Sequence, residues 1–139
     1  MTDEPDLPPG VGPHEGRELE LMLAGAKPLA MFYDAVPATV DLPEADFAPH
    51  VAAGRIVMRE EIYKSARTAN ATRYLYYALP KEVWRIDALH SMQSSFYAGR
   101  PATDADDTEI GRLLGYSETD IKAFIEWRQR LRTKPSKPA

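Results

Sequence analysis

The chain has 139 residues, a formal net charge of −4 and no cysteine, which leaves room for one domain with a modest hydrophobic core. Without cysteine, a disulfide framework, a thiol nucleophile, an iron–sulfur cluster and a cysteine-ligated zinc site are excluded. The acidic balance disfavours non-specific binding to nucleic acid or membranes, and with no long apolar run and no secretory-type N-terminus we expect a cytoplasmic protein without a cofactor.

The charges are segregated along the chain. Residues 1–54 carry 10 acids and 2 bases, and residues 55–103 carry 8 bases and 4 acids. Residues 104–126 carry 7 acids and 2 bases, and residues 127–139 carry 5 bases and no acid. Such blocks either neutralise one another within the fold or present separate surfaces to separate partners. We favour mutual neutralisation within one fold.

The first third of the chain predicts a leader, a helix, a strand and a loop. Residues 1–16 are rich in proline, glycine and acids, so they bury too little apolar surface to offset their ordering entropy, and we expect them to be disordered. A short helix is expected within residues 16–28 and an apolar strand over residues 28–36. Residues 37–55 are expected to form a loop, and we expect Pro49 to interrupt any turn of helix within it.

The middle of the chain predicts an antiparallel hairpin followed by a helix. Residues 55–64 and 73–80 form the two strands, joined by a polar connection, and the apolar period becomes helical over residues 81–99. With two more helices at the C-terminus, we expect an α+β domain over residues 17–132. It has a small antiparallel sheet of about three strands packed by helices, with a C-terminal helical hairpin, and a flexible basic tail over residues 133–139.

The predicted hairpin is both basic and aromatic. Alternation along its first strand places Ile56, Met58 and Ile62 on one face. Interleaved bases and aromatics can stack nucleobases, but no RNA-binding signature accompanies them and the acidic total argues against that function. Tyrosines are good sheet formers when half-buried against a helix, so we expect core packing first and a protein interface second. The anchors expected in the second case are Tyr74, Tyr76 and Trp127.

The stretch EIGRLLGYSETDIKAFIEWR near the C-terminus has the spacing of a helical pair. Gly111 is the small residue that allows a close approach, Gly115 lies in the turn, Ser117 can cap the second helix and Ile121 belongs to its inner face. Over about 20 residues this stretch resembles the helix-turn-helix of bacterial regulators. The resemblance implies a DNA-reading second helix.

The acids around this helical pair argue for a different partner. A DNA-reading helix presents its first residues to bases and phosphates, and carboxylates at those positions repel a phosphate backbone. The sequence therefore favours a protein partner over a DNA groove. The acidic residues that we expect to form this partner-binding patch are Asp104, Asp106, Asp107, Glu109, Glu118 and Asp120.

The histidines and strand-end acids give no catalytic or metal-binding pattern. No histidine pair has metal-ligand spacing, so no metal site is expected, and no phosphate-binding loop is present. We expect a small non-enzymatic protein-binding module, an accessory, regulatory or inhibitory protein of the immunity or antitoxin type, whose partner has a basic surface. The alternatives are a DNA-binding regulator that uses residues 108–128 and a small enzyme that uses Asp34, His50 or His90.

Overall fold

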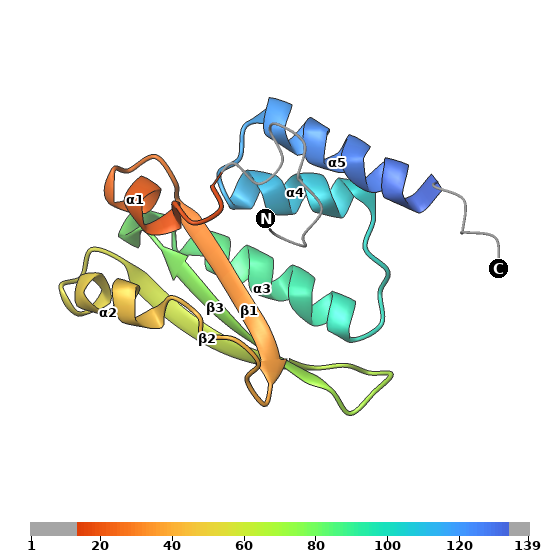
Figure 1. Cartoon of the computed structure of the whole chain (residues 1–139), viewed down its shortest axis with the longest axis horizontal. Helices are drawn as coiled ribbons and strands as arrows, with labels where there is room; N and C mark the ends of the chain where they lie inside the picture. Colours follow the sequence, from red (N-terminus) through yellow and green to blue (C-terminus); the bar gives the residue numbers. More distant parts are fainter. Residues whose placement is uncertain (1–13, 134–139) are drawn as a thin grey trace, which may run out of the picture.

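The computed structural model describes residues 14–133. Over this range it contains a three-stranded sheet and five α-helices (Figure 1), which confirms the α+β prediction. The elements in chain order are α1 (Glu18–Leu23), β1 (Leu29–Val36), α2 (Glu44–Ala52), β2 (Val57–Lys64), β3 (Ala71–Ala78), the 3-10 turn η1 (Pro80–Glu82), α3 (Trp84–Tyr97), α4 (Asp104–Leu113) and α5 (Glu118–Thr133). The predicted leader and basic tail fall, at residues 1–13 and 134–139, outside the described range.

The sheet is antiparallel throughout and has the strand order β1-β3-β2. β3 is central, with Leu29 of β1 and Val57 of β2 both opposite its Ala78. Because β1 and β2 are the edge strands, each leaves one row of backbone groups unpaired within the sheet.

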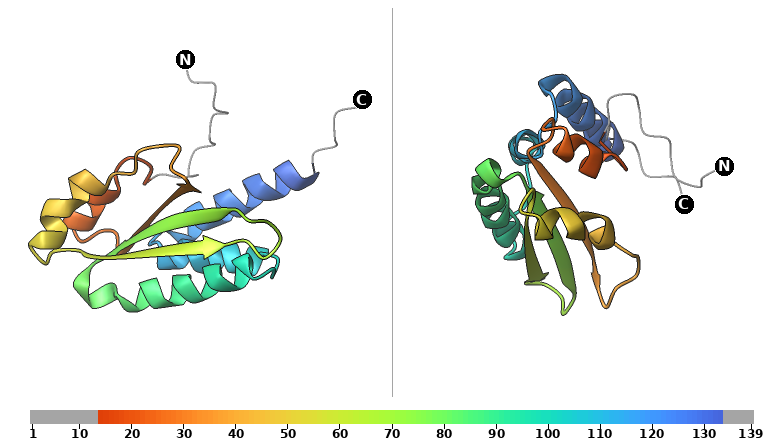
Figure 2. Two further views of the ribbon diagram at one scale, coloured as in Figure 1. Left: turned by 90° about the horizontal axis from the view of Figure 1, so that it is seen from below. Right: turned by 90° about the vertical axis from the view of Figure 1, so that its left-hand side faces the viewer.

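Helices cover both faces of the sheet, with α3 on one side and α2 on the other (Figure 2). The face toward α3 packs Tyr74 and Tyr76 against Ile86 and Leu89. The opposite face packs its own cluster, made by Met22, Ala30, Phe47, Ile56, Leu75 and Tyr77. The hydrophobic core is therefore divided by the sheet into two layers.

The structure corrects the expected interruption at Pro49. α2 is a continuous nine-residue helix with Pro49 inside it. The proline lies at its sixth position, where only one backbone donor is lost near the helix end. Phe47 anchors the helix, since its ring is 2% exposed and stacks on Tyr77 at 4.1 Å between centroids. Tertiary packing of this aromatic pair outweighs the local penalty of the proline.

The sheet also decides which face of β2 is buried. Met58 and Ile62, which share a face as predicted, are 41% and 55% exposed. The charged face lies under α3, where the Arg59 guanidinium donates to Glu61 at 2.6 Å and to Asp87 of α3 at 2.8 Å. Charges can face a helix at this position because the helix supplies their partners.

α4 and α5 form the predicted helical hairpin, and they lie side by side in Figure 1. Thr103 caps α4 in a capping box with Asp106, and the Ser117 hydroxyl accepts from the Asp120 amide at 3.1 Å. Gly115 has a φ of +88° in the turn. At Gly111 an added Cβ would lie 2.7 Å from Cγ1 of Ile121, so only glycine permits this approach of the two helices.

Candidate functional site

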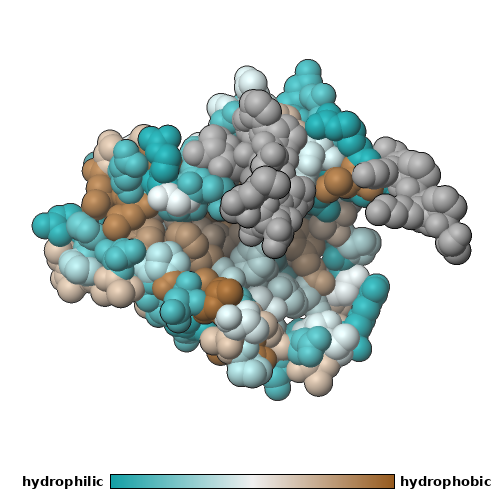
Figure 3. All heavy atoms as spheres, in the orientation of Figure 1, coloured by the Kyte–Doolittle hydropathy of each residue, from teal (hydrophilic) through white to brown (hydrophobic). Residues whose placement is uncertain are grey.

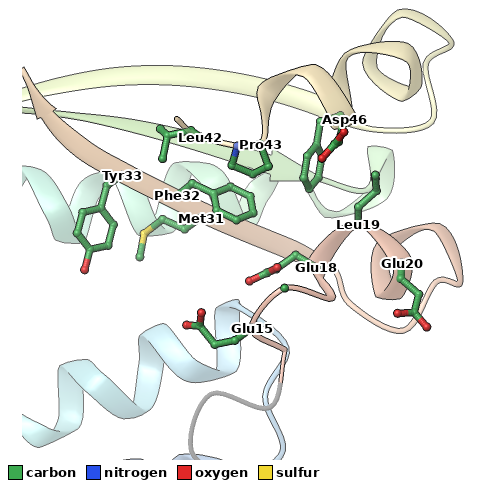
Figure 4. A pocket seen from close by; sticks show the side chains of 12 residues that line it. Glu15, Glu18, Leu19, Glu20, Met31, Phe32, Tyr33, Leu42, Pro43 and Asp46 are labelled. Carbon is green, nitrogen blue, oxygen red and sulfur yellow. The ribbon is translucent and has the colours of Figure 1, made fainter. Parts of the chain in front are cut away.

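A hollow of about 730 Å³ opens beside β1, between α1 and α2. Apolar side chains recessed between hydrophilic ones mark it in Figure 3. Figure 4 shows Glu15 and Glu18 on one wall, facing Met31 and Phe32 of β1, with Asp46 of α2 on the opposite wall. We call this hollow the β1 groove. It is lined by Glu15, Gly16, Glu18, Leu19, Glu20, Met31, Phe32, Tyr33, Leu42, Pro43, Asp46 and Phe47.

The wall formed by the β1–α2 connection is shaped by Asp34. Its carboxylate accepts from the Thr39 amide at 2.8 Å, the Thr39 hydroxyl at 2.6 Å and the Val40 amide at 3.1 Å. The Thr39 hydroxyl and these amides lower the pKa of Asp34 to about 2. Asp34 thereby folds the connection back along the sheet, which places Leu42 and Pro43 in the groove wall. An aspartate near the end of a strand commonly has this turn-forming role.

Three carboxylates of the groove are left without a close partner. Glu15, Glu18 and Asp46 make no hydrogen bond or ion pair through their side chains with any other residue between 14 and 133, although Glu18 attracts the Lys27 ammonium at longer range. Glu20 differs, because it accepts from Arg17 at 3.4 Å and points away from the hollow in Figure 4. Within residues 14–133, the groove therefore combines an apolar floor with three carboxylates that have no close partner.

The acids of the predicted α4–α5 patch are mostly paired within the hairpin. Asp104 accepts from Arg132 at 2.7 Å and from Gln129 at 2.8 Å, and Asp107 accepts from Arg128. These contacts join the start of α4 to the end of α5. Contacts of this kind form where two antiparallel helices pack along their whole length. In a DNA-reading helix-turn-helix, by contrast, the two helices meet at about 90–120°.

The remaining patch acids lie at the ends and the outer side of the hairpin. Asp106 accepts from Arg100 at 2.9 Å, and Glu118 accepts from Arg112 at 2.6 Å. Glu109 and Asp120 take part in no ion pair of the described residues. Four of the six predicted acids are thus neutralised by arginines of this chain, as the mutual-neutralisation interpretation of the charge blocks expects.

The predicted aromatic anchors lie in or close to the core. Tyr76 is 0% and Tyr74 is 6% exposed, so neither ring is available to a partner in this fold, and both have the core-packing role that the sequence favoured first. Trp127 is half-buried on α5 beside Phe124, with 5.9 Å between the ring centroids. The aromatic ring that is open to solvent at the sheet edge is Tyr33, at 58% exposure.

A buried lysine joins the segment before β1 to the turn between α4 and α5. The Lys27 ammonium donates to the Leu114 carbonyl at 2.5 Å and contacts His14 Nδ1 at 2.9 Å. It also lies 4.7 Å from the centroid of the Tyr116 ring, on which His14 stacks. Burial lowers the pKa of Lys27 to about 8. Being 2% exposed, this lysine fixes one end of the groove wall but is out of reach of a ligand.

A tyrosine–histidine network lies between the sheet and α3. The Tyr63 hydroxyl is 2.7 Å from the Tyr76 hydroxyl and 2.7 Å from His90 Nδ1. Burial raises the pKa of Tyr63. The groups of the enzymatic alternative do not converge, since His90 contacts this network on the α3 side, while Asp34 caps the β1–α2 connection and His50 contacts Arg55 at 3.4 Å.

Comparison of the chain with family models, with curated proteins and with solved structures finds no match. Within residues 14–133 no group of three or more histidine, aspartate or glutamate side chains is arranged to hold a metal ion. No helix in this range is long and apolar enough to cross a membrane.

Sequence reasoning did not single out the groove residues. A signal was present, because residues 1–54 hold the largest excess of acids in the chain. What was missing was the position of Glu15, Glu18 and Asp46 around one apolar floor, since these residues come from two helical segments that only the fold brings together.

Proposed function

We propose that this protein is a binding module that holds a basic segment of another protein in the β1 groove. The observation that carries the proposal is the set of unpaired carboxylates around an apolar floor. An accessory, regulatory or inhibitory role would follow from masking that segment. The proposal keeps the basic protein partner expected from the sequence and moves its site from the α4–α5 acids to the groove.

The two chemical parts of the groove favour two different features of the ligand. Leu19, Phe32 and Leu42 provide partly exposed apolar surface, and burying aliphatic carbon against it stabilises a complex by about 25 cal/mol per Å². Unpaired carboxylates at the rim attract lysine and arginine, which speeds association and selects the partner. A segment with alternating apolar and basic side chains satisfies both.

The charge of the groove also separates this partner from others. Nucleic acid brings phosphates, which the rim carboxylates repel. A second copy of this chain would bring two acidic rims together, which costs association free energy. A volume of about 730 Å³ fits a few side chains of a partner.

The proposal can be tested by selecting, from a displayed library of random octapeptides, those that bind the full chain. We expect the selected peptides to be rich in lysine or arginine alternating with apolar residues. The double variant Glu18→Gln/Asp46→Asn should bind the best peptide about three- to tenfold more weakly at low salt, with a smaller difference at high salt, because partly exposed charges contribute a few tenths to 1 kcal/mol each.

The matched control is Glu109→Gln/Glu126→Gln, which removes the same charge from the exposed sides of α4 and α5. It should leave peptide affinity unchanged. Selection of no peptide, or an equal loss of affinity in both double variants, would refute the groove as the binding site. If only Glu109→Gln/Glu126→Gln lowered peptide affinity, the binding site would be the α4–α5 patch predicted from the sequence.

A further inference from the structure

Among residues 14–133, the outer edge of β1 carries backbone groups without a partner next to the groove. The Leu79 amide donates to the Pro28 carbonyl at 3.1 Å, and the register continues with Ala30 opposite Tyr77 and Phe32 opposite Leu75. Hydrogen-bonded pairs alternate in an antiparallel ladder. The backbone N–H and C=O groups of Met31 and Tyr33 therefore point away from β3, toward the open side of the strand. The Ala35 amide is already engaged by the Asp34 carboxylate.

The two edges of the sheet differ in how they are protected. β2 has the sequence VMREEIYK, with four charged side chains in eight residues, and β1 has the sequence LAMFYDAV, with one. Charged residues on an edge strand prevent pairing with another chain. Charged side chains therefore protect the edge of β2 against pairing with another strand, and the edge of β1 lacks this protection. β1 is also the strand that lines the groove.

We infer that the basic segment binds by adding a fourth strand to the outer edge of β1. This inference rests on the proposed function and specifies how the same site is used. Main-chain hydrogen bonds to Met31 and Tyr33 provide affinity in this mode, and alternate side chains of the segment provide specificity. The exposed ring of Tyr33, which stacks on Tyr74 at 5.1 Å, extends the sheet surface on which such a strand can pack.

The geometry of an added strand divides the side chains of the segment between the two faces of the sheet. Residues opposite Phe32 turn toward the face covered by α2, where the partly exposed Leu19 and Leu42 form the apolar floor. Basic residues at the margin reach Glu18 on one wall and Asp46 on the other. The alternation expected for the ligand is therefore the two-residue period of a strand.

Scanning N-methylation of the best library peptide tests the inference. Each N-methyl group removes one backbone donor from the peptide. We expect affinity to fall about three- to tenfold at every second position, where the N–H faces β1, and to change less than twofold at the positions between. A helical ligand would not show this two-residue period, because its N–H groups bond within the helix.

Hydrogen exchange of the protein provides a second measurement on the same complex. With peptide at ten times its Kd, exchange of the Met31 and Tyr33 amides should slow about tenfold. The Phe32 amide is the internal control, since it is already bonded to β3 and should change little.

The outcomes separate the inference from the proposed function. If no peptide is selected, both fail. If peptides bind and Glu18→Gln/Asp46→Asn weakens them, but the N-methyl scan has no period of two and the outward amides are not protected, strand addition is refuted and the groove proposal stands. If the free chain sediments as a dimer and exchange of the Met31 and Tyr33 amides is already slow without peptide, a second copy occupies the edge, and the inference is overturned.

Discussion

Replacing Lys27 by methionine should remove a rise in stability between pH 7.5 and 9.5. The lysine is 2% exposed, and burial lowers its pKa from 10.5 to about 8. The unfolded chain therefore holds a proton at this position that the folded chain has released over the range from about pH 8 to 10.5. Where the unfolded state binds more protons, the free energy of unfolding increases with pH.

The size of the effect follows from the two pKa values. One pKa unit corresponds to about 1.4 kcal/mol. Integrating the difference in bound protons from pH 7.5 to 9.5 gives a gain in unfolding free energy of about 2 kcal/mol for the native chain. Tyrosine has a usual pKa of about 10, so the tyrosines of the unfolded chain begin to lose protons near the top of this window. That contribution is common to the native chain and Lys27→Met, and it cancels in the difference between them.

Urea unfolding at half-unit steps of pH measures the difference directly. The native chain should gain about 2 kcal/mol relative to Lys27→Met over this window. Lys122→Met, at an exposed position on α5, should keep the native pH dependence. Parallel curves for the native chain and Lys27→Met would refute the assignment of a lowered pKa to this lysine, and with it the burial of a charged ammonium beside the Leu114 carbonyl.

Two further substitutions test the packing of α4 against α5 and of the sheet against α3. Gly111→Val should destabilise the fold by about 1–3 kcal/mol, because any Cβ meets Ile121 at 2.7 Å, and a thermal or urea melt measures the loss. Tyr63→Phe should cost about 1–3 kcal/mol in the same assay, because it leaves the Tyr76 hydroxyl and His90 Nδ1 without their shared partner.

Matched substitutions at exposed positions control for these effects. Ala105→Val introduces the same side chain on an open face of α4 and should cost less than about 1 kcal/mol. Tyr33→Phe removes a hydroxyl that is exposed on β1, and stability should change by less than about 0.5 kcal/mol. Equal losses at Gly111 and Ala105, or at Tyr63 and Tyr33, would contradict the packing described for those sites.

Much of the secondary structure followed from the sequence because its signals are local. Alternation identified β2 (Val57–Lys64), and the change of apolar period after the hairpin identified α3 (Trp84–Tyr97). The same holds for the C-terminal hairpin, where Gly111, Gly115 and Ser117 have the roles that their spacing indicates. Backbone freedom, capping and side-chain period act over a few residues, so one sequence contains them in full.

The charge blocks were visible in the sequence, but their pairing was decided by the fold. Asp104 and Asp107 are separated from Arg132 and Arg128 by more than twenty residues, and the antiparallel packing of α4 and α5 brings them together. Composition gives the balance of charge without the distances that determine which charges are neutralised.

Tertiary structure alone decided which surfaces are buried and where the groove lies. The alternating pattern of β2 allows either face of the strand to be turned toward the helices. The charged face lies against α3 because Asp87 of that helix pairs with Arg59. Pro49 is accepted within α2 because Phe47 packs on Tyr77. Burial is a property of segments that are distant in sequence and meet in space. The sequence by itself therefore determined the elements and the balance of charge, and the packing of those elements determined which residues are left to meet a partner.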